Sequence, residues 1–372
     1  MENTILRGSC LEMLKQIPDE SVDCCVTSPP YYGLRDYGTG KWIGGDPNCD
    51  HKIEHVRKDS VCGVGTHSRM ENDGIPVGGT IVKFKCPKCG AIRQDEQIGL
   101  ETTPEEYIEN LVKVFHEVKR VLKNDGTLWV NIGDTYYGDS GSRGTDYHDD
   151  RTDVVQSSNK GFNDMKFVPK LKGSKNLKPK DLIGIPWMLA FALRNDGWYL
   201  RQDIIWHKPS PMPESVKDRC TKSHEYIFLL SKNQKYYFDH DAMQEVANEE
   251  NKKRYDYDFN TGKEQEDFRP DGASNTPGKK EYTGMRNKRD VWTVNSSSFK
   301  GAHFATFPED LIEPMILAGS RESGIVLDPF MGSGTVGVVA KKNGRKYLGC
   351  ELNPEYADMA QTRISNVITS LF

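Results

Sequence analysis

Short apolar runs and amphipathic stretches alternate along much of the chain. Six runs of four to eight mostly apolar residues have the length and composition of buried strands: 22–27, 127–132, 199–206, 225–230, 325–328 and 346–351. Longer stretches that begin at 104, 183, 335 and 354 are patterned as helices. Strands that alternate with helices are typical of a parallel sheet covered by helices, so the chain is predicted to adopt an α/β fold.

The helix that begins at 104 has the clearest start signal. Thr103 is a suitable N-cap, Pro104 fits the first helical position, and Glu106 completes a capping box. Apolar residues then recur at helical spacing: Tyr107, Leu111, Val114, Val118 and Val121. This apolar face is predicted to pack on the sheet.

Three segments lack such periodicity. Residues 42–100 are irregular and rich in Gly, Cys and His, residues 136–180 are polar, and residues 234–293 contain few aliphatic side chains in their middle part. We interpret the second as a mobile loop that contacts a ligand surface. The chain is therefore divided into a first part, an insertion, a continuation that contains the loop, a third segment and a final part: 1–41, 42–100, 101–233 (loop 136–180), 234–293 and 294–372.

Composition indicates a sizeable protein without membrane segments. At 372 residues the chain exceeds one compact domain, and no apolar stretch approaches the roughly 20 residues that a membrane span requires. The N-terminus lacks the pattern of a signal peptide. Nine cysteines, two of them adjacent at Cys24 and Cys25, fit reduced thiols better than a disulfide framework. We expect a soluble cytoplasmic protein.

A glycine-rich turn follows the apolar run 325–328. It reads D-P-F-M-G-S-G-T from Asp328 to Thr335, and its glycines allow a ligand to approach the backbone at a helix N-terminus. Glu351 follows Asp328 by 23 positions, at the end of the next apolar run, where a carboxylate can accept hydrogen bonds from ribose hydroxyls. The turn and the acid together predict a nucleoside-binding site.

A second motif, T-S-P-P-Y at 27–31, ends the first apolar run, because two prolines cannot continue a strand. Together with the turn at 328–335 it resembles the catalytic and cofactor motifs of the DNA amino-methyltransferases, which act on adenine N6 or cytosine N4. The catalytic motif comes first along the chain, as in the group called beta. Residues 302–308 resemble that family's additional cofactor-pocket motif, and residues 131–134 resemble the strand end that flanks its cofactor site.

The resemblance implies a doubly wound, mostly parallel, seven-stranded sheet with circularly permuted motifs. It implies S-adenosyl-L-methionine as methyl donor and double-stranded DNA as substrate; a homodimer and a cognate restriction endonuclease are further partners compatible with it. The catalytic residues it implies are Ser28, Pro29, Pro30 and Tyr31. The cofactor-binding residues it implies are Asp328, Pro329, Phe330, Gly332, Ser333, Gly334, Thr335, Glu351, His303, Phe304 and Phe307.

The S-P-P-Y loop suits methylation of an amino group. An aromatic amino nitrogen is a poor nucleophile because its lone pair is delocalised into the ring. The Ser28 hydroxyl and the Pro29 carbonyl can accept its hydrogens, while Tyr31 stacks on a base rotated out of the duplex. In-line attack on the sulfonium methyl then depends on positioning. Methylation of cytosine carbon 5 is disfavoured, since it requires a cysteine after a proline and no Pro-Cys dipeptide occurs.

Ser28 favours cytosine N4 as the target, because S-P-P-Y is typical of the cytosine enzymes of the resembling family and D-P-P-Y of the adenine enzymes. Adenine N6 stays open, since a hydroxyl and a carboxylate both accept hydrogen bonds. Two wider alternatives are an RNA or protein methyltransferase and a non-catalytic DNA-binding protein on the same fold. The intact motifs disfavour the non-catalytic alternative.

The insertion at 42–100 contains residues of metal-ligand type. Cys86 and Cys89 form a C-x-x-C knuckle whose thiolates can share one tetrahedral ion, and Cys49 and His51 can supply two more ligands. One of the four could be replaced by Cys62, His55 or His67. We predict a structural Zn²⁺ site that forms a rigid scaffold near the DNA; free thiols in a loop are the alternative.

The net charge of −4 gives no global attraction to nucleic acid, so a DNA surface requires local clusters of basic residues. The beta arrangement places target recognition between the catalytic half and the cofactor motif, which indicates residues 234–293. The candidate DNA contacts are Arg35, Lys166, Lys170, Lys172, Lys279, Lys280, Arg286 and Arg289. For each cluster a solvated surface is the alternative.

Overall fold

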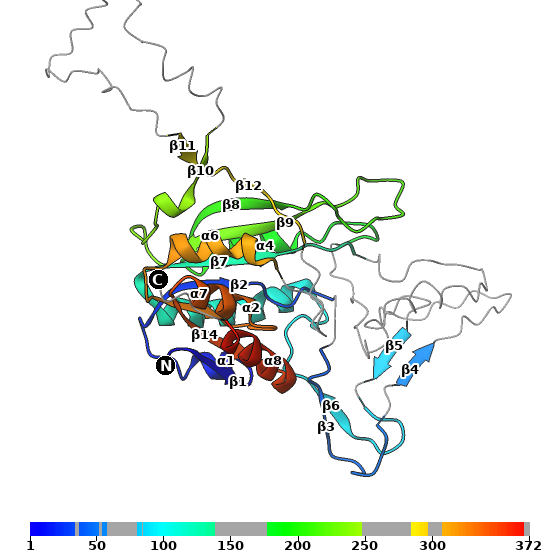
Figure 1. The fold of residues 1–372 in the computed structure, drawn as a ribbon. Helices are drawn as coiled ribbons and strands as arrows, with labels where there is room; N and C mark the ends of the chain where they lie inside the picture. Colours follow the sequence, from blue (N-terminus) through cyan, green and yellow to red (C-terminus); the bar gives the residue numbers. More distant parts are fainter. Residues whose placement is uncertain are drawn as a thin grey trace, which may run out of the picture.

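The computed structural model describes residues 1–33, 37–51, 54–57, 80–83, 85–137, 177–247, 284–296 and 307–367, with the backbone alone at 54–57 and 80–83. These residues form one large sheet with helices on both faces, together with three small two-stranded sheets (Figure 1). The predicted α/β, doubly wound fold is confirmed. No helix of the described chain is both long enough and apolar enough to span a membrane.

The large sheet contains eight strands among the described residues, one more than expected. Their order is β1 (Thr4–Arg7), β14 (Lys346–Glu351), β13 (Ile325–Asp328), β2 (Val22–Thr27), β7 (Leu122–Ile132), β9 (His224–Ser231), β8 (Tyr199–His207) and β12 (Val291–Thr293). All neighbours are parallel except β9, which is antiparallel to β7 and β8. The strands β1 and β12 are too short to produce a periodic pattern in the sequence.

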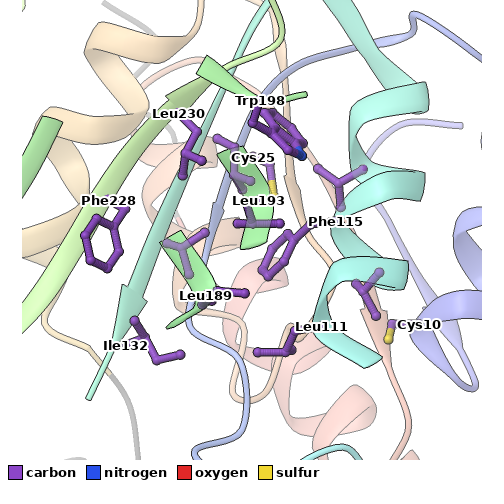
Figure 2. Close-up of a cluster of buried hydrophobic side chains, with 14 of the residues drawn as sticks. Cys10, Cys25, Leu111, Phe115, Ile132, Leu189, Leu193, Trp198, Phe228 and Leu230 are labelled. Carbon is purple, nitrogen blue, oxygen red and sulfur yellow. The ribbon is translucent and has the colours of Figure 1, made fainter. Parts of the chain in front are cut away.

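Helices cover the two faces of this sheet. On one face lie α1 (Cys10–Leu14), α2 (Pro104–Val121) and α4 (Ile185–Asn195), and on the other lie α6 (Glu309–Gly319), α7 (Thr335–Lys342) and α8 (Pro354–Ser365). Figure 2 shows Phe115 of α2 and Leu193 of α4 pointing into the first of the two apolar clusters. Burial of two such clusters holds the helices against the strands.

The start of α2 agrees largely with its sequence signal. The Thr103 hydroxyl accepts a 3.2 Å hydrogen bond from the Glu106 backbone N–H, as an N-cap should. The Glu106 carboxylate reaches one residue further back than predicted, to the backbone N–H and hydroxyl of Thr102. The five predicted apolar positions of this helix are all buried: Tyr107, Leu111, Val114, Val118 and Val121.

The strand directions bring several chain segments to one edge of the sheet. The parallel strands β13, β14, β2 and β7 all have their carboxyl ends at this edge. Because β9 runs the opposite way, its first residues lie beside the end of β8, with Glu225 opposite Trp206. Functional side chains of open α/β sheets gather at this edge.

The three small sheets are antiparallel pairs outside this framework. The pair β3 (Lys41–Ile43) with β6 (Ile92–Gln94) joins the two ends of the inserted segment, which also contains β4 (Glu54–Arg57) with β5 (Thr80–Lys83). The third pair, β10 (Gln244–Val246) with β11 (Met285–Asn287), lies in the segment 234–293 next to the 3-10 helix η1 (Asp241–Met243).

Candidate active site

A cavity of about 590 Å³ lies at the carboxyl edge of the sheet and contacts both sequence motifs. The two motifs follow β2 and β13, which are neighbours in the sheet although about 300 residues separate them in the chain. Of the predicted residues, the cavity is lined by Ser28, Pro29, Pro30, Tyr31, Phe307, Asp328, Pro329, Phe330, Gly332, Ser333, Thr335 and Glu351.

Three predicted cofactor residues are not among the lining. Gly334 has a φ of +82°, and a Cβ atom at this position would lie 2.8 Å from the Cβ of Ala360 in α8. A glycine is therefore required at position 334 so that the turn can pack against α8. Gly334 is not one of the residues that line the cavity, so the prediction that it contacts the ligand is not supported. His303 and Phe304 lie outside the described residues.

A buried hydrogen bond joins the strands that carry the two motifs. The Thr27 hydroxyl donates to Asp328 Oδ1 at 2.6 Å, and the same oxygen accepts the Phe330 backbone N–H at 3.0 Å. Burial raises the pKa of Asp328 to about 7, although the hydrogen bond from Thr27 acts in the opposite direction. Asp328 thus holds the glycine turn against the end of β2.

Glu351 fixes the other side of the turn. Its Oε2 accepts the Gly332 backbone N–H at 2.8 Å, and its Oε1 accepts the Asn353 backbone N–H at 2.8 Å. Each carboxylate oxygen has a further lone pair, so both can still accept a hydrogen bond from a ligand hydroxyl in the cavity. Burial raises the pKa of Glu351.

The S-P-P-Y loop is held by residues from α2 and from the end of the insertion. The Pro30 carbonyl accepts a 2.8 Å hydrogen bond from the Tyr107 hydroxyl. The Gly33 N–H donates to the Gly99 carbonyl at 2.9 Å. These two contacts fix the loop on both sides, so its polar atoms are positioned before a substrate binds.

Tyr31 is anchored through its hydroxyl, which donates to Glu225 Oε2 at 2.6 Å. Asn131 Nδ2 donates to the same oxygen at 3.2 Å. Burial and the neighbouring Glu225 carboxylate raise the pKa of Tyr31, so the phenol stays a neutral donor at physiological pH. A Cβ atom at Gly133 would lie 2.7 Å from the Tyr31 ring, and this glycine leaves room for the ring.

The sequence analysis missed an ion pair in the cavity. Lys208 forms an ion pair with Glu225, and their side chains are only 22% and 15% exposed. The Lys208 ammonium also lies 4.2 Å from the centroid of the Trp206 ring. The sequence does show a charged residue at one end of each of the apolar runs 199–206 and 225–230. That these two residues lie together, however, depends on the antiparallel pairing of β8 and β9.

The residues at the strand end 131–134 have different roles. Asn131 lines the cavity. Asp134 instead accepts hydrogen bonds from the backbone N–H groups of Gly184 (3.0 Å) and Ile185 (3.1 Å), which are at the start of α4. It therefore caps a helix that begins without a capping side chain of its own.

The four predicted metal ligands come together in the inserted segment. One ligand atom from each of Cys49, His51, Cys86 and Cys89 lies within 4.8 Å of all the others. Cys49 Sγ is 3.8 Å from Cys86 Sγ, and Cys89 Sγ is 3.2 Å from His51 Nδ1. Such spacings fit a tetrahedral ion bound by thiolates and an imidazole, so the donor set suits Zn²⁺.

Two of the eight predicted DNA contacts fall within the described residues. Arg286 and Arg289 both pair with Glu245, at 2.9 Å and 3.2 Å, and the side chain of Arg289 is 69% exposed. The remaining six lie outside the described residues: Arg35, Lys166, Lys170, Lys172, Lys279 and Lys280.

Comparisons with known proteins agree with this geometry. A family model described as DNA methylase, of the N6/N4 methyltransferases, matches residues 22–362. The Type II methyltransferase M.Cfr9I of Citrobacter freundii is 41% identical over 368 residues, which cover 99% of this chain and 89% of that protein. The Type II methyltransferase M.SmaI of Serratia marcescens is 39% identical over 360 residues, with 97% and 90% covered.

Two solved structures share the fold. The PvuII DNA methyltransferase (cytosine-N4-specific) has a TM-score of 0.53 at 15% identity and covers 100% of this chain and 88% of its own. TTHA0409 of Thermus thermophilus, solved in complex with S-adenosyl-L-methionine, has a TM-score of 0.51 at 18% identity, with 99% and 96% covered. Because the family model spans most of the sequence and the two Type II relatives match along almost their whole length, the chain belongs to the N6/N4 family of DNA methylases, the amino-methyltransferases of DNA, in its beta arrangement.

Proposed function

We propose that this protein transfers a methyl group from S-adenosyl-L-methionine to cytosine N4 within a specific sequence of double-stranded DNA. The observation that supports the proposal most strongly is the cavity that joins the S-P-P-Y loop to the glycine turn and Glu351. The structure of TTHA0409 with S-adenosyl-L-methionine, on a similar fold, supports the choice of methyl donor.

The cofactor would occupy the half of the cavity formed by β13 and β14. Glu351 would accept hydrogen bonds from the ribose hydroxyls, while the backbone around Gly332 allows close approach. Further lining on this side comes from Phe330, Phe307 and Tyr356. The bound cofactor supplies an electrophilic sulfonium methyl group.

The target base would occupy the other half, beyond β2. The Ser28 hydroxyl and the Pro29 carbonyl would accept the two amino hydrogens and direct the nitrogen lone pair toward the methyl group. Tyr31, whose hydroxyl is fixed by Glu225, would present its ring to a base rotated out of the duplex. A base that fills this half would displace water from around its amino group, so that these hydrogen bonds would be strong.

The preference for cytosine rests on Ser28 and is supported by the cytosine-N4-specific name of the PvuII enzyme. Adenine N6 is the alternative within the same family. The test is to incubate purified protein with labelled S-adenosyl-L-methionine and duplex DNA, RNA or protein. Label in DNA, recovered after digestion as N4-methylcytosine, supports the proposal. Label only in RNA or protein would refute it, and N6-methyladenine would transfer the assignment to adenine.

We further propose that Cys49, His51, Cys86 and Cys89 hold a structural Zn²⁺ ion. The thiolates and the imidazole would complete a tetrahedral shell and stabilise a segment that has few apolar residues to bury. Metal analysis of the purified protein should give one zinc per chain. Loss of zinc in the Cys86→Ser variant supports this ligand set, whereas an unchanged zinc content contradicts it.

The remaining proposals concern DNA and partners. Residues 234–293 would recognise the target sequence, with Arg286 and Arg289 near phosphates, and the segment 136–180 would contact the duplex. As the modification enzyme of a restriction–modification pair, the protein would act in the cytoplasm beside a cognate endonuclease, and as a homodimer if two copies share one site. Salt dependence of DNA binding, reduced in the Arg289→Ala variant, tests the phosphate contact.

A further inference from the structure

The inserted segment also contacts the cavity of the candidate active site. We propose that residues 37–51 and 85–99, here called the metal module, form a wall of the cofactor half of the cavity, so that metal occupancy sets the affinity for S-adenosyl-L-methionine. The inference rests on the proposed function, since it requires both the metal and the cofactor.

The end of the module that is remote from the Cys/His cluster faces the cavity. Five of its residues contribute to the lining: Tyr37, Thr39, Glu96, Gln97 and Ile98. The first two precede β3 in the chain, and the other three follow its partner β6. A wall made in this way keeps its shape only while the two segments stay together.

This wall contacts the residues that follow Glu351. Asn353 Nδ2 donates to the Tyr37 carbonyl at 3.3 Å, and the Asn353 N–H is itself bound to Glu351 Oε1. The rings of Tyr37 and Tyr356 meet edge to face, with centroids 6.3 Å apart. The module is therefore positioned against the carboxylate that would bind the ribose, and it approaches the nucleoside end of the cofactor.

Polar contacts connect the two segments of the wall. The Thr39 hydroxyl donates to Asp95 Oδ1 of the other segment at 2.6 Å, and Asp95 also pairs with Arg93 of its own segment at 3.0 Å. The Tyr37 N–H donates to Gln97 Oε1 at 2.7 Å. These contacts continue the β3–β6 pairing from the knuckle to the cavity, and Cys86 joins that pairing through the hydrogen bond of its N–H to Ala91.

The module has a small apolar core. The two described sheets of the inserted segment are pairs of short strands, and a two-stranded pair is marginally stable in water. Among the described residues of the module, the buried apolar side chains are Cys86, Ala91 and Ile98. A metal ion that binds the folded module would therefore supply much of its stability, and loss of the metal would loosen the wall.

The coupling has to be reciprocal, because two ligands that stabilise one folded segment favour each other's binding. We expect the dissociation constant for S-adenosyl-L-methionine, measured by calorimetry on the full chain, to rise at least about 10-fold when zinc is stripped and to recover when zinc is restored. Saturating S-adenosyl-L-methionine should slow zinc transfer to a colorimetric chelator. A structural role without contact with the cofactor would leave that rate unchanged.

The variant Asp95→Ala tests the coupling with the metal ligands intact. It removes the acceptor that joins Thr39 to Arg93 while leaving all four metal ligands in place. We expect it to keep its zinc, to bind S-adenosyl-L-methionine more weakly, and to lose the effect of the cofactor on zinc release. The control is Glu12→Ala, which removes an exposed carboxylate on α1 and should behave as the wild type.

The outcomes identify which proposal fails. The native protein could contain zinc while its stripped, reloaded and Asp95→Ala forms all bind S-adenosyl-L-methionine with the same affinity. That result would overturn the inference and leave the proposed function intact. Absence of zinc from the protein would overturn the metal site and this inference together. Failure of every form to bind S-adenosyl-L-methionine would overturn the proposed function itself.

Discussion

The hydroxyl of Thr27 donates a 2.6 Å hydrogen bond to the carboxylate of Asp328, across 301 positions of sequence. Thr27 is the last residue of β2 and Asp328 the last of β13, so this bond joins the strand that precedes the S-P-P-Y loop to the strand that precedes the glycine turn. Both partners are buried. The relative position of the two motifs, on which the proposed methyl transfer would depend, is therefore fixed inside the core.

The variant Asp328→Asn should change the pH dependence of stability. Burial raises the pKa of Asp328 to about 7 in the folded protein, well above its value of roughly 4 in an unfolded chain. The folded protein therefore holds the proton more tightly, and this contribution to stability is present below pH ~4 and is lost as pH rises to ~7. Asparagine keeps an acceptor for Thr27 but does not titrate.

Urea unfolding of both proteins between pH 4 and 8 tests this expectation. The free energy of unfolding of the wild type should fall relative to that of Asp328→Asn up to about pH 7 and run parallel above it. A constant difference across the range would show that Asp328 does not titrate there.

The variant Tyr31→Ala should abolish methyl transfer while leaving the dissociation constant for S-adenosyl-L-methionine near that of the wild type, because the ring is assigned to the base and not to the cofactor. Tyr31→Phe keeps the ring and loses the hydrogen bonds of its hydroxyl to Glu225 and Asn131, so we expect about a 10-fold decrease in kcat at most. Steady-state kinetics and calorimetry on the three proteins give the answer. Equal loss of transfer and of cofactor binding in Tyr31→Ala would contradict the assignment.

The variant Glu351→Ala should weaken binding of S-adenosyl-L-methionine by about 10- to 100-fold, since it removes a carboxylate that would accept charge-assisted hydrogen bonds from the ribose. It also releases the Gly332 N–H. The matched control is Glu355→Ala, an exposed carboxylate in the first turn of α8. Calorimetry on both variants measures the effect, and equal affinities in the two would remove Glu351 from the cofactor site.

Lys208 and Glu225 should depend on each other for stability. Their side chains are mostly buried as an ion pair, so removing one charge leaves the other poorly solvated. We expect Lys208→Met and Glu225→Gln each to lower the free energy of unfolding by about 1–3 kcal/mol, and the double variant to lose less than the sum. A double-mutant cycle in urea measures the coupling. Strict additivity would mean that the pair has no energetic importance.

Local patterns predicted much of the fold, and nonlocal pairing explains what they missed. The runs 22–27, 325–328 and 346–351 are buried strands whose apolar residues are contiguous in sequence, so their strands and the motifs that follow them could be located. Helix α6 was not predicted, since Pro314 interrupts its pattern. The short edge strand β12 exists because it pairs with β8.

The residues of the candidate site likewise fall into those that local motifs predict and those that depend on nonlocal pairing. Residues 28–31 and Glu351 belong to contiguous motifs, whereas Glu225 and Lys208 reach the cavity only through the antiparallel pairing of two distant strands. The proximity of the four Cys and His side chains could be predicted from residue spacing, because the knuckle is a local turn. The proximity of Tyr37 to Tyr356 could not, since it depends on how the insertion packs against α8.

Expression of the wild type and of Tyr31→Ala in cells that lack endogenous DNA methylation tests the central claim most directly. DNA from both cultures is digested to nucleosides for mass spectrometry and read by single-molecule sequencing. The wild type should give N4-methylcytosine at one defined sequence, and Tyr31→Ala should give none. N6-methyladenine without N4-methylcytosine, or no modified base in the wild-type DNA, would contradict the claim.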